Sequence, residues 1–262
     1  MNALGGQVIR HGRIRGGHAR AAWRALRAVA HVLRGLWIIR TEFGRLTHAQ
    51  SQLIVREWSR RMLAIMGITL DVQGQAPAHG PVLVVANHLS WLDIVVMNAA
   101  HPSRFVSKAD AQHWPLLGSL ITGAGTLYIE RENRRDALRV VHRMAERLRE
   151  GETVSVFPEG TTGDGSRLLP FHANLLQAAI SASAPVQPVA LRYLDSGTGQ
   201  PHPGPVFVGE DTLIASVWRT LRADTVRAVV RYGTPQRAGD RDRRAWAEAL
   251  RAEVQAELDA AR

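Results

Sequence analysis

A histidine and an aspartate five residues apart are the side chains of this sequence best suited to acid–base chemistry. His88 and Asp93 lie in the segment NHLSWLD, directly after the apolar run Val82–Ala86. A carboxylate at this spacing can accept a hydrogen bond from one imidazole nitrogen, which fixes the tautomer and raises the basicity of the other nitrogen. A histidine held in this way can remove a proton from an alcohol that attacks a carbonyl carbon. The pair therefore predicts general-base catalysis.

The same segment also fits a structural arrangement. Ser90 and Asp93 have the spacing of a helix-capping box, with Ser90 as the cap and Asp93 at the third helical position. In that interpretation Asp93 stabilises the start of a helix and His88 is an ordinary turn residue. Taken alone, the segment is compatible with both interpretations.

A second turn with reactive groups follows another apolar run. The run Thr153–Phe157 ends at Pro158, and Glu159, Gly160 and Thr161 come next. Proline stops the strand ladder, and glycine permits a turn that exposes backbone N–H groups to an anion or a carbonyl oxygen. Because active sites of α/β proteins gather where strands end, we expect both turns at one edge of a sheet if their strands are neighbours.

The elements that would position these turns alternate between β-rich and helical patterns. Strands are expected at 69–72, 82–86, 104–107, 126–129, 153–157, 186–193 and 226–232, and helices at 91–99, 116–122, 134–150, 173–183, 211–221 and 240–260. This alternation predicts an α/β domain over residues 68–262, with a largely parallel, mixed sheet flanked by helices and the motif core at 82–190. Residues 1–67 are expected to form an N-terminal helical segment, with helices at 21–39 and about 45–67.

The N-terminal segment carries the excess positive charge of the chain. Of the 33 basic and 23 acidic residues, 12 arginines and two glutamates lie in residues 1–61, which leaves 21 of each sign for the remainder. One helical stripe is basic and a neighbouring one is apolar: Arg20, Arg24, Arg27, His31 and Arg34 beside Trp23, Leu26, Ala30, Leu33 and Trp37. This pattern is typical of a helix at a lipid interface. It predicts that residues 20–40 bind an anionic membrane surface.

Two other roles for this helix are less well supported. It could pack its apolar face on the protein's own core, with the arginines in water. Its apolar face is too broad for a groove-binding arm, so no nucleic-acid partner is expected. Each long uncharged stretch of the chain is interrupted by polar residues, glycine or proline, which favours a protein that lies on a membrane over one that spans it.

The complete absence of cysteine excludes disulfides, thiolate metal sites and a cysteine nucleophile. Together, the ordered motifs resemble the glycerolipid acyltransferase family, best known from the 1-acylglycerol-3-phosphate acyltransferases. Four blocks carry the resemblance, within residues 60–195: Asn87–Asp93, Gly125–Arg131, Phe157–Thr161 and Val186–Val189.

The resemblance implies an O-acyltransferase in which His88 is the general base and Asp93 orients it. The acceptor oxygen would attack the thioester of acyl-CoA or acyl carrier protein directly; the chain has no Gly-x-Ser-x-Gly nucleophile elbow. Acceptor-binding groups would be Lys108, Arg131 and the turn Glu159–Thr161. The position of Arg131 in its motif favours binding over the alternative, an exposed ion pair with its acidic neighbours.

The family further implies a lysophospholipid acceptor, in the first place 1-acylglycerol-3-phosphate, which would give phosphatidic acid. It implies no metal and no bound cofactor. It implies a peripheral or monotopic position on the cytoplasmic face of the bacterial inner membrane.

One departure from the family pattern affects the acceptor. Thr162 stands where the third block usually has an arginine, and threonine cannot form a bidentate clamp on phosphate. Arg167 could take over that contact, or the acceptor could lack phosphate, as in the lyso-ornithine lipid acyltransferases. Two different function classes also fit parts of the sequence: a membrane-binding module without catalysis, and a hydrolase in which the same base activates water.

Overall fold

The computed structural model describes residues 17–114, 117–129 and 134–260. Its described residues form a seven-stranded sheet in the order β1-β7-β6-β2-β5-β3-β4. The strands are β1 (Thr69–Gln73), β2 (Val82–Ala86), β3 (Arg104–Lys108), β4 (Leu127–Ile129), β5 (Thr153–Val156), β6 (Val186–Asp195) and β7 (Val226–Tyr232). Neighbouring strands are parallel except β6 and β7, which are antiparallel. The predicted mixed, largely parallel sheet is therefore confirmed.

The helices lie between these strands or precede them. They are α1 (His18–Thr41), α2 (His48–Met66), α3 (Asp93–Ala100), α4 (Leu117–Gly123), α5 (Arg134–Arg149), α6 (Gln177–Ser181), α7 (Leu213–Arg222) and α8 (Arg243–Ala260), with 3₁₀ turns η1 (Phe43–Arg45), η2 (Ala109–His113) and η3 (Ala173–Leu176). The expected elements are found with ends shifted by at most three residues, except that the helix expected at 173–183 is divided into η3 and α6.

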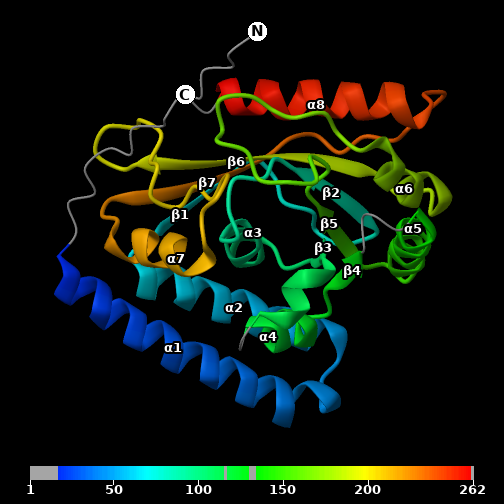
Figure 1. Cartoon of the computed structure of the whole chain (residues 1–262). Coiled ribbons are helices and arrows are strands. Elements are labelled where there is room, and N and C mark those ends of the chain that lie inside the picture. Colours follow the sequence, from blue (N-terminus) through cyan, green and yellow to red (C-terminus); the bar gives the residue numbers. More distant parts are fainter. Residues whose placement is uncertain (1–16, 115–116, 130–133, 261–262) are drawn as a thin grey trace, which may run out of the picture.

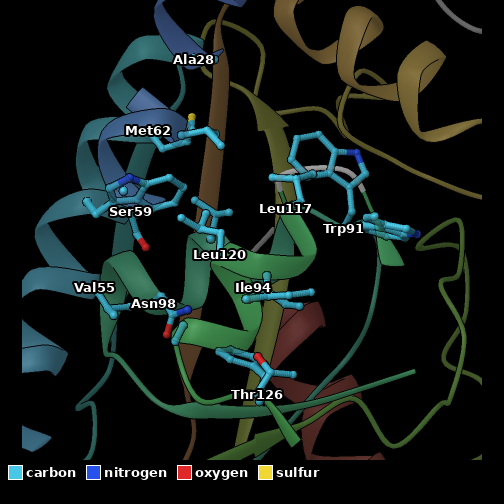
Figure 2. Close-up of a pocket in the computed structure, with 18 of the residues that line it drawn as sticks. Ala28, Val55, Ser59, Met62, Trp91, Ile94, Asn98, Leu117, Leu120 and Thr126 are labelled. Carbon is cyan, nitrogen blue, oxygen red and sulfur yellow. The ribbon is translucent and has the colours of Figure 1, made fainter. Parts of the chain in front are cut away.

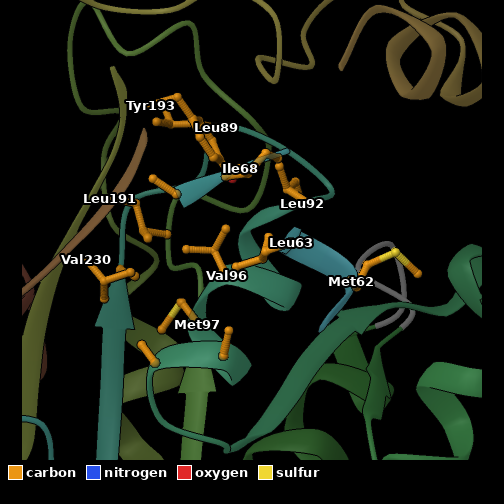
Figure 3. Close-up of a cluster of buried hydrophobic side chains, with 14 of the residues drawn as sticks. Met62, Leu63, Ile68, Leu89, Leu92, Val96, Met97, Leu191, Tyr193 and Val230 are labelled. Carbon is orange, nitrogen blue, oxygen red and sulfur yellow. The ribbon is translucent and has the colours of Figure 1, made fainter. Parts of the chain in front are cut away.

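Helices cover both faces of the sheet (Figure 1). Along β2, Val82, Val84 and Ala86 belong to the core beneath α2, α3 and α7, whereas Leu83 and Val85 belong to the core beneath α5, α6 and α8. This alternation follows from the two-residue period of a strand, and a strand buried on both faces is a continuous apolar run. Figure 3 shows the first of these cores.

The N-terminal helices pack together and against α3, α4 and α7. The ring of His31 stacks on Trp58 at 4.9 Å, and each side chain hydrogen-bonds the other residue's carbonyl oxygen at 3.0 and 3.1 Å. Burial lowers the pKa of His31, which keeps the ring neutral near pH 7. A Cβ on Gly35 would lie 2.6 Å from Trp58 Nε1, so glycine permits the close approach of α1 to α2.

The orientation of α1 divides the basic stripe that the sequence shows. Part of the basic stripe faces the protein: Arg20 pairs with Asp224, Arg24 donates to the carbonyls of Leu221 and Ala223, and His31 is buried. The stripe of Trp23, Leu26, Leu33 and Trp37 points outward, with 50–62% of each residue exposed. The inward side of α1 carries small residues, including Ala21 and Gly35, which let it pack closely on the neighbouring helices.

In the part of the chain that the structure describes, no helix combines the length and apolar character needed to cross a bilayer.

Candidate active site

The predicted pair meets at the carboxyl end of β2. His88 Nδ1 lies 2.8 Å from Asp93 Oδ2, and the same oxygen accepts hydrogen bonds from the backbone N–H groups of Leu89 and Ser90 at 2.6 and 2.9 Å. Asp93 is completely buried, whereas the His88 side chain is 18% exposed. Because an ionised carboxylate only accepts hydrogen bonds, Nδ1 must carry the proton that it donates to Asp93.

The capping interpretation is wrong in its positions: the residue before the helix is Leu92, without a side-chain cap hydrogen bond, and Asp93 is the first helical residue instead of the third. Ser90 Oγ accepts a hydrogen bond from the Leu92 amide at 3.2 Å, while Asp93 Oδ2 accepts one from the Ser90 amide. The carboxylate thus stabilises the turn and orients the imidazole at the same time.

The second nitrogen of His88, Nε2, has a different environment from Nδ1. Its ring stacks on Phe157, with the two centroids 4.0 Å apart and the planes at 7°. Within the described residues, Nε2 makes no hydrogen bond. With its proton on Nδ1, the imidazole presents Nε2 as a base held between a carboxylate and an aromatic face.

Asn87 ties the histidine turn to β6. Its side-chain amide donates to the carbonyl of Leu191 at 3.0 Å, and its side-chain oxygen accepts from the Leu191 amide at 2.7 Å. The buried side chain thereby continues the pairing of β2 with β6 past Ala86, where the backbone leaves the ladder. Sequence reasoning included Asn87 in the motif but found no role for it.

The turn after β5 lies against the histidine turn, as expected for neighbouring parallel strands. Glu159 is buried; its Oε1 accepts from the His88 amide and its Oε2 from the Leu169 amide, both at 2.8 Å. The Gly163 amide donates to the His88 carbonyl at 2.8 Å. Burial raises the pKa of Glu159, opposed by these two backbone hydrogen bonds.

The structure gives the positions of the other residues predicted to bind the acceptor. Both side-chain oxygens of Glu159 accept hydrogen bonds from backbone amides. The Gly160 amide donates to the carbonyl oxygen of Phe157. Thr161 is exposed. Lys108 ends β3, 57% exposed, and pairs with Asp110 at 2.5 Å; it lines neither of the cavities described below.

Two of the predicted contacts concern arginine side chains. Arg131 lies outside the described residues. Arg167 lines a polar pocket together with His88.

His88 lies between two cavities of opposite character. An apolar cavity of about 380 Å³ is lined by α1, α2, α3, α4 and α7 on the first core's side of the sheet, with His88 in its wall. Figure 2 shows Ser59 and Met62 of α2 together with Ile94 of α3 and Leu120 of α4 around it. The polar pocket, of about 100 Å³, borders α8.

The apolar cavity was not predicted from the sequence. Small residues of α1, among them Ala25, Ala28 and Gly35, line it.

Asp93 has one further partner that sequence reasoning missed. Its second oxygen, Oδ1, accepts a hydrogen bond at 2.6 Å from the hydroxyl of Tyr193, on β6. The only sequence signal was the place of Tyr193 at the end of the expected strand 186–193.

Comparison with known proteins agrees with this arrangement. A family model described as acyltransferase matches residues 68–192. The 1-acyl-sn-glycerol-3-phosphate acyltransferase of Neisseria meningitidis is 44% identical over 181 residues, which cover 66% of this chain and 70% of that protein. This chain belongs to the acyltransferase family.

Two further relatives extend the comparison of this acyltransferase. The lyso-ornithine lipid O-acyltransferase of Pseudomonas aeruginosa is 40% identical over 173 residues, 66% of each chain, and that of Brucella abortus is 31% identical over 225 residues, 78% of this chain and 84% of that one. The crystal structure of the 1-acyl-sn-glycerophosphate acyltransferase of Thermotoga maritima superposes with a TM-score of 0.65 at 17% identity, over 90% of this chain and 97% of that chain. The resemblance seen in the sequence is confirmed, and so is the fold.

Proposed function

We propose that this acyltransferase moves a fatty acyl group from an acyl thioester to the free hydroxyl of a lysophospholipid. The observation that carries the proposal is the position of His88, whose Nδ1 is bound by Asp93 and whose ring borders both an apolar cavity and a polar pocket. An acyl chain fits the apolar side and a headgroup fits the polar side, which brings an ester-forming hydroxyl to the base between them.

The reaction follows from this geometry. His88 Nε2 takes the proton of the acceptor hydroxyl while its oxygen attacks the thioester carbonyl carbon. The carbon–sulfur bond then breaks, the proton passes from the imidazolium to the leaving thiolate, and an ester and a free thiol result. Asp93 stabilises the imidazolium that exists in between. No group of the protein is acylated, and the donor is acyl-CoA or acyl carrier protein.

The first candidate acceptor is 1-acylglycerol-3-phosphate, which would give phosphatidic acid. It is favoured by the name of the Neisseria relative and by Arg167, which lines the polar pocket beside His88. The second candidate is a lyso-ornithine lipid, favoured by Thr162 and by the names of the Pseudomonas and Brucella relatives.

We further propose that the outward stripe of α1 binds the membrane surface. Trp23, Leu26, Leu33 and Trp37 are exposed, and Arg27 and Arg34 lie beside them, also exposed. Aromatic and aliphatic side chains enter the interfacial region of a bilayer, and arginines bind its anionic headgroups.

The opposite side of α1 lines the apolar cavity, through Val32 and Gly35 among others. A lipid leaving the bilayer would therefore have a short path to His88. We propose a peripheral position on the cytoplasmic face of the inner membrane.

The test combines a product assay with a variant. The enzyme is given acyl-CoA and equal amounts of 1-acylglycerol-3-phosphate and lyso-ornithine lipid, and both the released thiol and the lipid products are measured. We expect acceptor-dependent thiol release with phosphatidic acid as the main product; a main product of ornithine lipid would select the second candidate. His88→Ala should lower the rate at least 10³-fold and leave vesicle binding intact.

Two results would contradict the proposal. Thiol release that does not depend on an acceptor would indicate a hydrolase. An active His88→Ala variant would exclude His88 as the base.

A further inference from the structure

The two oxygens of the Asp93 carboxylate are used unequally. Oδ2 accepts three hydrogen bonds, from His88 Nδ1 and the amides of Leu89 and Ser90, whereas Oδ1 accepts one, from the hydroxyl of Tyr193 at 2.6 Å. Asp93 is fully buried and Tyr193 is 3% exposed. Figure 3 shows Tyr193 beside Leu89 in the core under the histidine turn. Among the described residues, the Tyr193 hydroxyl therefore makes the only hydrogen bond to Oδ1.

The strand register brings Tyr193 to this position. Asn87 binds both backbone groups of Leu191, and Leu191 and Tyr193 point to the same face of β6 because side chains alternate along a strand. The residues Val189, Leu191 and Tyr193 all belong to the core that contains the start of α3. A slip of one residue would direct Arg192 toward that core in place of Tyr193.

Tyr193 acts as a proton donor to the carboxylate. Burial, together with the negative charge of Asp93, raises the pKa of Tyr193 well above its ordinary value, so the phenol keeps its proton. The donor–acceptor distance of 2.6 Å is in the range of a hydrogen bond between a hydroxyl group and an anion.

We propose that Tyr193 is a positioning residue of the transfer reaction: its hydroxyl fixes the rotation of the Asp93 carboxylate and partly neutralises its charge, and in this way sets the basicity of His88. This inference rests on the proposed role of His88 as general base. Without the hydroxyl, Oδ1 has no hydrogen bond among the described residues, and only the contacts of Oδ2 keep the carboxylate on Nδ1. The Asp93 carboxylate then keeps more of its negative charge and stabilises the imidazolium form of His88. A higher pH is therefore needed to deprotonate the imidazolium.

Other charged groups lie near His88 and Asp93, and a substitution of Tyr193 leaves all of them in place. Glu159 interacts electrostatically with both His88 and Asp93. The polar pocket that His88 lines also contains Asp164, Arg167, Arg192 and Asp259. All of these remain when Tyr193 is replaced, so a change in the pH profile reports the lost hydroxyl.

The first experiment compares Tyr193→Phe with a matched control. Tyr232→Phe removes the same atom from another buried tyrosine, on β7, whose hydroxyl binds neither His88 nor Asp93. The logarithm of kcat/KM against pH reports groups of the free enzyme, and general-base catalysis loses rate on its acid side. For Tyr193→Phe we expect this acid limb to move to higher pH by up to about one unit, with a roughly tenfold lower plateau. Tyr232→Phe should follow the wild type.

A purely structural role would give a different result. Tyr193→Phe would then lower the melting temperature and the folded fraction, but its rate per folded enzyme would keep the wild-type acid limb. That outcome overturns the proposal. Inactivity of the wild type toward every lysolipid would instead overturn the proposed function, so the two failures are distinguishable.

The second experiment keeps the hydroxyl and strengthens it as a donor. The chain has only three tyrosines, so in a Tyr128→Phe/Tyr232→Phe background 3-fluorotyrosine enters at position 193 alone. Fluorine makes the phenol more acidic and hence a stronger hydrogen-bond donor. We expect the acid limb to move to lower pH than in the same background with ordinary tyrosine, opposite to Tyr193→Phe. An unmoved limb, or one moved in the same direction, would overturn the proposal even if Tyr193→Phe does not fold.

Discussion

The proposed chemistry depends on a carboxylate that is held from several sides. Asp93 receives hydrogen bonds from the ring of His88, from two amides of its own turn and from Tyr193 on β6. Because Asp93 is fully buried, such bonds are strong, and each fixes the orientation of the next. The imidazole is therefore confined to one tautomer and one plane, with Nε2 facing the space where the substrates would meet.

Asp93→Asn is expected to disable this arrangement while leaving the fold intact. An amide cannot accept all four hydrogen bonds, and its NH₂ group facing His88 would favour the tautomer with the proton on Nε2. By analogy with the same substitution in serine proteases, we expect kcat to fall roughly 10³- to 10⁴-fold. Thiol release gives the rate, and circular dichroism confirms folding. Activity within tenfold of the wild type would show that Asp93 does not orient the base.

At the scale of elements, α1 combines two surfaces on one helix. Its inner side contains Val32 and Gly35, which line the apolar cavity. Its outer side carries an apolar stripe that the rest of the described protein leaves uncovered. A helix of this kind can lie at a bilayer and at the same time form the wall between that bilayer and the active site.

The outer stripe can be tested with matched leucine substitutions. Leu26→Ala/Leu33→Ala removes aliphatic surface from residues that are 62% and 50% exposed; Leu138→Ala does the same at a residue 66% exposed on α5. Burying the methyl and methylene groups lost from the pair would contribute about 2 kcal/mol or more, so binding to anionic vesicles should weaken at least tenfold. Cosedimentation measures it, and Leu138→Ala should bind as the wild type does.

Salt gives an independent check on this surface. Because Arg27 and Arg34 are exposed beside the stripe, added salt should weaken wild-type binding. Equal binding by the double-leucine variant, or binding that salt does not change, would contradict the proposed membrane surface.

At the scale of the whole molecule, the site is an assembly of three neighbouring strands. β2 leads to His88, β5 leads to Glu159 and β6 carries Tyr193, and the sheet order β6-β2-β5 brings their ends together. Glu159 joins parts of the chain 71 residues apart, and Tyr193 joins parts 100 residues apart. The position of His88 therefore depends on the order of the strands in the sheet more than on its own loop.

Glu159→Gln tests whether the turn after β5 supports the position of His88. The control is Glu152→Gln, at another buried glutamate, which pairs with Arg104. The side-chain amide introduced by Glu159→Gln would accept one backbone hydrogen bond and oppose the other donor, so the free energy of unfolding should fall by about 1–3 kcal/mol. We expect kcat per folded enzyme to fall at least tenfold, because the His88 turn loses its support. Glu152→Gln should reduce stability but not kcat. Equal kcat in both variants would limit Glu159 to a role in stability.

The elements of this protein were predictable from local pattern, because their determinants are local. The two-residue period of the strands, the helical period of α1 and α2, and the turns after β2 and β5 each depend on residues close in sequence. The ordered motifs around His88 and Glu159 were sufficient to indicate the family, and the comparisons confirmed it.

Other features depended on tertiary packing. The pattern of α1 showed a basic and an apolar stripe, but which of them faced the protein was decided by the close contact at Gly35 and by Asp224, far along the chain. The cavity forms between helices that are far apart in the sequence, α1, α2, α3, α4 and α7. Tyr193 meets Asp93 because of a strand register that no local pattern encodes. Sequence pattern thus specified the reactive groups and their elements, whereas packing between distant segments decided the environment in which those groups act.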